Sequence, residues 1–215
     1  MNKTDKILFN EFGSAINDTD FILGKLCLAQ SDLYFGNTID EVILNAAEKA
    51  EILTDKLRRA VLHTAPSIEV YRQYEDNLVK QLNIRVELLE NQILKIGIPA
   101  LIPHRKAHTS YIYKPLHHAL KQFKAEREFE LFKECTVAFI HCYDKKLPKT
   151  RIRDHDNIEE KQVMDIIKSF YMESDNGLYA DTYHTTRIHD SDATMIYVMD
   201  NKVFPEWIYS IEFFA

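Results

Sequence analysis

The sequence predicts an α+β protein in which an N-terminal helical hairpin is followed by a small mixed α/β domain. Two observations lead to this fold class. Apolar residues recur every three or four positions through most of the first hundred residues, which is the period of an amphipathic helix. From about residue 94 the chain changes to shorter apolar runs separated by prolines and charged loops, which is typical of strands alternating with helices. We therefore expect helices over 1–93, an α+β domain over 94–200 and an aromatic tail over 201–215.

Two long helices are expected to form the hairpin. The first opens with the capping-box pattern of Thr38, followed by Glu three positions later, and its apolar stripe ends near His63. Pro66 lies in the break after it, and a second apolar stripe then runs to Ile93. Helices joined by so short a loop should fold back antiparallel. Residues 1–36 are less regular and predict at most a short additional helix.

The second half begins with a strand, a helix and a further strand. We expect a strand over 96–102, which Pro99 would confine to a sheet edge or a bulge. Pro115 fits the first turn of a following helix. The run 136–143 is almost wholly apolar and is the strongest strand signal in the chain.

A helix, a turn and two strands complete the expected domain. The helix covers 158–172, and Ser, Asp, Asn and Gly at 174–177 form a turn signal. The runs 183–188 and 194–199 are strand-like and are separated by a short acidic segment, which predicts a hairpin. The aromatic tail that follows alternates like a final strand. It would cover the core or, alternatively, dock a second copy or another protein.

The composition is that of a soluble globular protein, with 46% hydrophobic and 28% charged residues among 215. No apolar run approaches the roughly 20 residues that span a bilayer, and the first residues lack the apolar core of a signal peptide, so we expect a cytoplasmic protein with no membrane contact. Three cysteines without a CxxC pattern indicate neither a disulfide framework nor a zinc ribbon. The net charge of −6 argues against a surface covered with nucleic-acid contacts.

The segment Arg153-Asp154-His155-Asp156-Asn157 carries the strongest chemical signal. In extended backbone Asp154 and Asp156 would point to one side, roughly 7 Å apart at Cα, with His155 turned away. Carboxylate oxygens at that separation suit Mg²⁺ or Mn²⁺ better than zinc. The same residues have a structural interpretation, because Asn157 and Glu160 have the spacing of a capping box that begins a helix.

A basic loop precedes this acidic segment. It runs from residue 145 to residue 153 and contains five cations and no acid. Such a run is ordinarily a solvated loop, but its position beside two carboxylates favours contact with a phosphate backbone. The candidate DNA-binding residues are Lys145, Lys146, Lys149, Arg151 and Arg153.

Residues of roughly 94–200 resemble the RusA type of Holliday junction resolvase, in which a strand leads into a D-x-D-N motif, a helix follows, and another acid precedes paired strands. The residues that carry the resemblance are Asp154, Asp156, Asn157, Asp165 and Asp175. The chain also looks like uncharacterised proteins of bacterial mobile elements that share the R-D-H-D-N segment. The resemblance implies a small homodimer that uses Mg²⁺ or Mn²⁺ to cleave branched DNA by phosphodiester hydrolysis.

The resemblance also implies roles for individual residues. Asp154, Asp156 and Asp175 would hold the metal, with Asp181 as a substitute ligand, and Lys161 would lie near the scissile phosphate. This chain departs from the pattern of RusA-type resolvases at two positions. The family pattern has a lysine where this chain has Glu160, so that the lysine here is displaced by one residue, about 100° around a helix. A single aspartate stands at 175 where the family often has two.

Other sites and functions compete with this one. His104 and His108 have zinc-ligand spacing but follow Pro103 in an expected loop, so a shared helix face is not predicted. His155 could reach a phosphate or simply face solvent. His141 and Cys142 lie on opposite faces of an expected strand, so they cannot act as a pair. There is no glycine-rich nucleotide loop. The competing function is a non-enzymatic protein that keeps the nuclease fold and binds a protein partner through its hairpin and aromatic tail.

Overall fold

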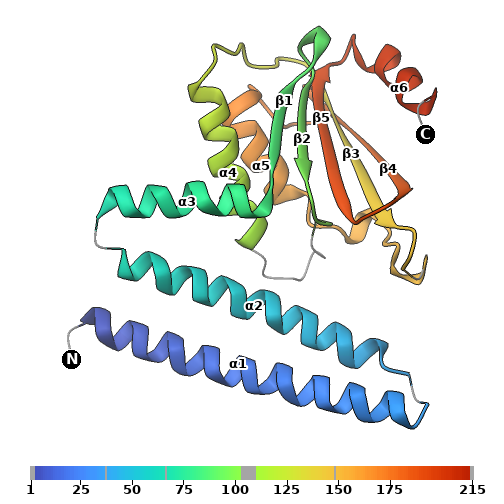
Figure 1. Cartoon of the computed structure of the whole chain (residues 1–215). Helices are drawn as coiled ribbons and strands as arrows, with labels where there is room; N and C mark the ends of the chain where they lie inside the picture. Colours follow the sequence, from blue (N-terminus) through green and yellow to red (C-terminus); the bar gives the residue numbers. More distant parts are fainter. Residues whose placement is uncertain (1–2, 37, 66, 103–109, 148, 214–215) are drawn as a thin grey trace. The chain divides into compact units, whose positions relative to one another are not determined.

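The computed structural model describes residues 3–36, 38–65, 67–102, 110–147 and 149–213. It divides into two compact units, one made of Met1–Tyr74 with Ala107–Tyr111 and the other of Glu75–Lys106 with Ile112–Ala215. The first unit is helical and the second contains a five-stranded sheet with helices (Figure 1), which confirms the predicted α+β class. Within the described ranges, none of the helices has the length and apolar character needed to cross a membrane.

The hairpin of the first unit is formed by α1 (Lys3–Tyr34) and α2 (Asp40–Thr64), which lie side by side in Figure 1. The helix predicted to end near His63 is confirmed as α2. The expectation that residues 1–36 form at most a short helix is wrong, and so is the expected pairing, because α2 packs on α1 rather than on the helix that follows Pro66. Large apolar side chains lie on several sides of α1, so a single amphipathic stripe does not mark it in the sequence.

The helix expected after the break ends early. α3 (Ile68–Leu82) stops where Asn83 adopts a left-handed conformation with φ of 51°, and the Asn83 amide donates to the Lys80 carbonyl at 3.1 Å. Asparagine tolerates this conformation, which commonly ends a helix. The apolar residues that follow belong to a β-hairpin made of β1 (Arg85–Leu88) and β2 (Leu94–Ile98), joined through the 3₁₀ turn η1 (Glu90–Gln92).

Two predicted helix starts also lie elsewhere. α2 begins at Asp40, and Ile39 occupies its N-cap position without a side-chain hydrogen bond, so the capping box at Thr38 does not form. α4 (Ser110–Ala125) contains Pro115 in its interior, whereas the prediction placed this proline in the first turn.

The sheet has the order β1-β2-β5-β3-β4. The predicted strand at 136–143 is confirmed as β3 (Cys135–Asp144), which pairs in parallel with β4 (Ala180–His189) and antiparallel with β5 (Ala193–Asp200). The predicted β4–β5 hairpin is wrong, because β3 lies between these two strands. The connection between them crosses the end of β3, where Asp192 Oδ1 accepts a hydrogen bond from the Asp144 amide at 2.9 Å.

The parallel pairing of β3 and β4 requires a crossover connection, and α5 (Lys161–Tyr171) supplies it. The prediction that Pro99 confines its strand to a sheet edge is wrong. β2 lies inside the sheet between β1 and β5, and Pro99 follows its last residue, where no ladder hydrogen bond is lost.

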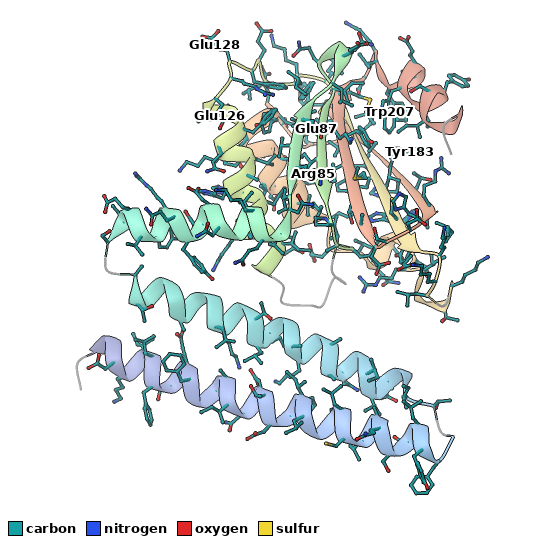
Figure 2. All side chains as sticks on the ribbon, in the orientation of Figure 1. Arg85, Glu87, Glu126, Glu128, Tyr183 and Trp207 are labelled. Carbon is teal, nitrogen blue, oxygen red and sulfur yellow. The ribbon has the colours of Figure 1, made fainter. Side chains whose placement is uncertain are left out.

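The two faces of the sheet are covered by different helices (Figure 1). On one face Ala138, Ile140 and Cys142 of β3 pack with Trp207 of α6 (Phe204–Phe213), close to Tyr183 of β4 (Figure 2). The aromatic tail is therefore a helix rather than the predicted strand, and its buried tryptophan covers the core. The other face of β3 carries the alternate side chains, among them His141, and lies against α4 and α5 (Figure 1). His141 and Cys142 do lie on opposite faces, as predicted.

Candidate metal centre

Three side chains of metal-ligand type meet on the sheet face that α5 covers. His141 lies on β3, His184 lies on the neighbouring β4, and Glu160 is the residue immediately before α5. In the parallel register His141 is opposite Thr186 and Phe139 is opposite His184, so both histidines point to the same face. The crossover between β3 and β4 carries Glu160 back over the two strands that hold the histidines.

The three donor atoms lie close enough together to share one metal ion. Glu160 Oε1 lies 3.0 Å from His141 Nε2 and 3.1 Å from His184 Nδ1. All three ligand atoms lie within 4.8 Å of one another. Atoms bound tetrahedrally to one zinc ion at about 2.0–2.2 Å are about 3.3 Å apart. In the part of the chain that the structure describes, no other group of three or more His, Cys, Asp or Glu side chains converges in this way.

The centre is enclosed and carries an ionised carboxylate. The His141 side chain is 1% exposed, and Glu160 and His184 are half-buried. Burial raises the pKa of Glu160, but hydrogen bonds from the two histidines outweigh it and hold this pKa below its usual value. The Phe139 ring stacks on His184 with 5.3 Å between centroids and shields one side of the centre.

One buried polar atom at the centre lacks a partner. When His141 Nε2 donates to Glu160, its Nδ1 is left as an acceptor, and this atom is buried without a hydrogen bond to any described residue. A buried polar atom without a partner costs free energy. The cluster therefore has the donor set of a cation site together with an unsatisfied ring nitrogen.

A fourth imidazole lies beside the three ligands. His155 belongs to the 3₁₀ turn η3 (His155–Asn157), and its ring centroid lies 5.5 Å from that of His141 and 5.6 Å from that of His184. Its Nε2 lies 3.0 Å from Thr186 Oγ1. Burial lowers the pKa of His155, and the two neighbouring imidazoles add to this effect. The ring is therefore neutral at pH 7 and can bind a metal or accept a proton.

The two aspartates of the acidic segment flank this histidine but lie outside the cluster. Asp154 and Asp156 are exposed, and the backbone between them is a 3₁₀ turn rather than the extended strand assumed in the prediction. The inward-facing residue of the segment is His155. The predicted capping box also fails, because α5 begins at Lys161 and its N-cap, Glu160, makes no side-chain cap hydrogen bond.

The remaining predicted acids have other partners. Asp175 forms an ion pair with Lys168, with 2.8 Å between Oδ1 and Nζ. Asp181 accepts a hydrogen bond from Asn201 Nδ2 at 3.2 Å, and strand alternation places it on the sheet face opposite to that of His184. Neither joins Asp154 or Asp156 in a close group of ligand atoms within the described ranges.

The predicted catalytic lysine also lies at the surface. Lys161 is exposed at the start of α5, and its Nζ lies 3.5 Å from Asp165 Oδ2, one helical turn away. The resemblance to RusA-type resolvases predicts a lysine at position 160. In this chain that position carries Glu160, which faces the histidines.

The basic loop leads directly into the candidate centre. Lys146 and Lys149 are exposed, and Lys145 forms an exposed ion pair with Asp190 at 2.6 Å. Arg153 has a structural role, because its Nη1 donates to the Ile102 carbonyl at 3.0 Å and its amide donates to the Tyr143 hydroxyl at 3.1 Å. The side chain of Arg151 lies outside the described part of the chain. His104 and His108, whose spacing resembles that of zinc ligands, also lie outside it.

Sequence reasoning missed the cluster because its three members come from separate elements. Glu160 was interpreted as a helix cap and as a departure from a family motif. His184 was not singled out. A usable signal did exist: His141 interrupts the most apolar strand of the chain and points to the same face as Phe139. A histidine at an inward strand position needs a polar partner.

The comparisons with known proteins place the chain in a family. The model of DUF6100, described as a family of unknown function, matches residues 12–212, and the chain belongs to this family. A comparison with curated proteins finds no match. Among solved structures the periplasmic domain of MotB from Helicobacter pylori (residues 90–256) is 12% identical, with a TM-score of 0.34. The alignment covers 60% of this chain and 86% of that one, and a score this low does not assign the fold.

Proposed function

We propose that the second unit is a metal-dependent hydrolase that cleaves phosphodiester bonds in DNA, with its metal held by His141, Glu160 and His184. The observation that supports this most is the convergence of the three donor atoms within 4.8 Å on an enclosed sheet face. Three protein ligands leave a coordination position for water, an arrangement typical of catalytic rather than structural metal sites.

The donor set supports a transition metal. Two imidazoles and one carboxylate suit zinc, manganese or ferrous iron, whereas magnesium prefers an all-oxygen shell. The magnesium site expected from the sequence would need Asp154 and Asp156 to meet a further acid. Asp175 is ion-paired with Lys168 instead, and Asp181 lies on the other face of the sheet. We therefore favour the histidine centre over the acidic one.

The basic loop supports DNA as the substrate. Lys146 and Lys149 are exposed, and the chain runs from them through Arg153 into His155, beside the candidate ligands. Exposed lysines at this position would contact the phosphate backbone. The resemblance to RusA-type resolvases concerns the same segment and favours branched DNA among DNA substrates.

The residues around the centre have roles that follow from their contacts. A metal bound here would lower the pKa of its water to about 7 and polarise a phosphoryl oxygen. Glu160 orients both histidines through one carboxylate oxygen. His155, neutral and fixed through Thr186, would accept the proton of the attacking water. Lys146 and Lys149 would hold the DNA backbone near the centre.

Cleavage assays on labelled four-way junction, flap and duplex DNA test this function. After the protein is stripped with a chelator, we expect cutting with Mn²⁺ or Zn²⁺ that is lost in Glu160→Gln and retained in the adjacent control Glu159→Gln. If cutting with Mg²⁺ were lost in Asp156→Asn but retained in Glu160→Gln, the active site would be the acidic segment instead. The absence of cutting with any metal would overturn the enzymatic proposal.

The second candidate is the non-enzymatic one, in which the helical hairpin binds a protein. The exposed apolar side chains of α1 favour this activity for the first unit. The aromatic tail is a less suitable docking segment, because Trp207 is buried against the sheet.

A further inference from the structure

α1 carries two stripes of side chains with opposite character. Its inner stripe consists of buried and half-buried positions on the side that packs on α2, and they recur at alternating steps of three and four residues, with the half-buried Ser14 beside the stripe. The members of this inner stripe are Leu8, Glu11, Ala15, Asp18, Ile22, Lys25, Ala29 and Asp32. Half of these residues are charged and two are alanine, so the contact between the hairpin helices buries little apolar surface.

Six large apolar side chains of α1 lie on an outer stripe instead. It has the same alternating spacing and is displaced by roughly 100° around the helix. Its eight positions are Phe9, Phe12, Ile16, Thr19, Leu23, Leu26, Gln30 and Leu33, all of them exposed. The six apolar members are between 47% and 69% exposed. An exposed apolar stripe of this length is unfavourable in water.

The spacing of the outer stripe specifies a helix as its partner. A repeat of three and four residues sustained over more than three heptads keeps one seam in contact with a second helix along its length. The other exposed apolar residues of α1, such as Phe21 and Leu28, recur only every seven residues and form no continuous seam. The surface is therefore suited to helix packing along a single line.

We propose that the outer stripe of α1 is the docking surface for the same stripe of a second copy, so that two hairpins associate through their α1 helices. The stripe contains no charged residue, so nothing in it repels an identical stripe. Six apolar side chains, each about half to two-thirds exposed, offer on the order of 600 Å² per copy, close to the roughly 800 Å² per partner of a standard interface. This surface lies outside residues 94–200.

The oligomeric state of matched variants tests the proposal. Light scattering coupled to size-exclusion chromatography would be run on the full chain and on Leu23→Lys and Leu28→Lys. These two leucines lie on the same helix and are 59% and 55% exposed, but only Leu23 belongs to the outer stripe. We expect a dimer for the unmodified chain and for Leu28→Lys, and a monomer for Leu23→Lys with unchanged helical content by circular dichroism.

Three outcomes would overturn the inference. A monomeric unmodified chain at about 50 μM would show that the stripe is not a self-docking surface, as would a dimer that persists in Leu23→Lys. Dissociation of Leu28→Lys alone would assign the interface to another side of α1. If Leu23→Lys lost helical content, the neighbouring stripe variant Ile16→Lys would replace it, with the same expected monomer.

Discussion

Glu160 is the residue on which the candidate metal centre depends most, because one of its carboxylate oxygens contacts both histidines. Without a metal, these hydrogen bonds satisfy the half-buried carboxylate. With a metal, the same oxygen and the two ring nitrogens become ligands. Glu160 thus stabilises the two histidines in the absence of a metal, and it would also bind the cation.

Replacing Glu160 with Gln should weaken Zn²⁺ binding by at least about 100-fold, since even loss of a partner behind a metal ligand costs 10–100-fold. Isothermal titration of the chelator-treated protein measures this change. Glu159→Gln is the matched control, because the structural hydrogen bond of Glu159 uses its backbone carbonyl, 3.4 Å from the Tyr113 hydroxyl. Equal affinities of the two variants would contradict the assignment of Glu160 as a ligand.

A buried charged residue, Asp18, lies in the contact between α1 and α2 of the hairpin. Its buried carboxylate accepts a hydrogen bond from Lys56 and lies 3.2 Å from Lys49 Nζ, and Lys56 also donates to Ser14 Oγ at 2.7 Å. This polar group fixes the register of α1 on α2, because a shifted register would leave the buried carboxylate without its partners.

Asp18→Asn should destabilise the hairpin by on the order of 2 kcal/mol, less than a fully buried pair because the lysines are partly exposed. Burial raises the pKa of Asp18, but the two lysine hydrogen bonds outweigh it and the net pKa is lowered. A lowered folded pKa gives stability that is present above the unfolded pKa, near 3.9, and is lost as pH falls through the folded value. Urea unfolding of both proteins should therefore converge below about pH 4. A constant difference between about pH 7 and pH 3 would contradict this.

α1 is a long helix with two interior glycines, and this composition limits its stability. Gly24 is exposed and lies on neither stripe, and a Cβ placed there meets nothing within 4 Å. Gly24→Ala should stabilise the helix by about 0.5–1 kcal/mol, because alanine has less backbone entropy to lose. Thermal unfolding followed by circular dichroism measures the change, and a lower melting temperature would show that this side of α1 has a partner.

α6 covers the sheet face opposite the metal centre, and two of its aromatic residues differ in burial, so they allow a packing contribution to be distinguished from a surface position. Trp207 is buried in the cluster that contains Ile140 and Cys142, whereas Tyr209 is exposed. Trp207→Ala should cost about 3–5 kcal/mol in denaturant unfolding. Tyr209→Ala should change stability by less than about 0.5 kcal/mol. Similar small effects for both variants would mean that the tail does not contribute to the core.

Metal binding should stabilise the second unit, because its three ligands come together only in the folded state. Zn²⁺ at 100 times its dissociation constant would add about 2.7 kcal/mol. Differential scanning calorimetry should therefore show a higher melting temperature of the second unit with Zn²⁺ than with the same concentration of Mg²⁺. An equal shift with both ions, or a zinc shift that persists in Glu160→Gln, would indicate a different binding site.

The elements best predicted from the sequence are those whose signal is local. The strand at 136–143 is a continuous apolar run, and it is β3 in the structure. The stripe that ends near His63 gave the end of α2 at Thr64. The errors arise where the same pattern of apolar residues is compatible with both a helix and strands. The apolar residues up to Ile93 fitted a helix period, but Asn83 ends α3 and turns them into a β-hairpin.

The candidate metal centre was likewise predicted only in part from the sequence. The segment from Arg153 to Asn157 was recognised from the sequence, but the chemistry was assigned to Asp154 and Asp156, which are exposed. The 3₁₀ turn there points His155 inward instead. Which side of a short segment faces the core depends on the elements packed over it, and local spacing does not contain this information.

The sequence by itself determined the α+β class and the position of β3, because these follow from periodicity along the chain. Only the tertiary structure decided that β3 separates β4 from β5, and that Glu160 meets His141 and His184. Both depend on contacts between residues that are distant in sequence. Such contacts are set by the packing of whole elements, which no local pattern encodes.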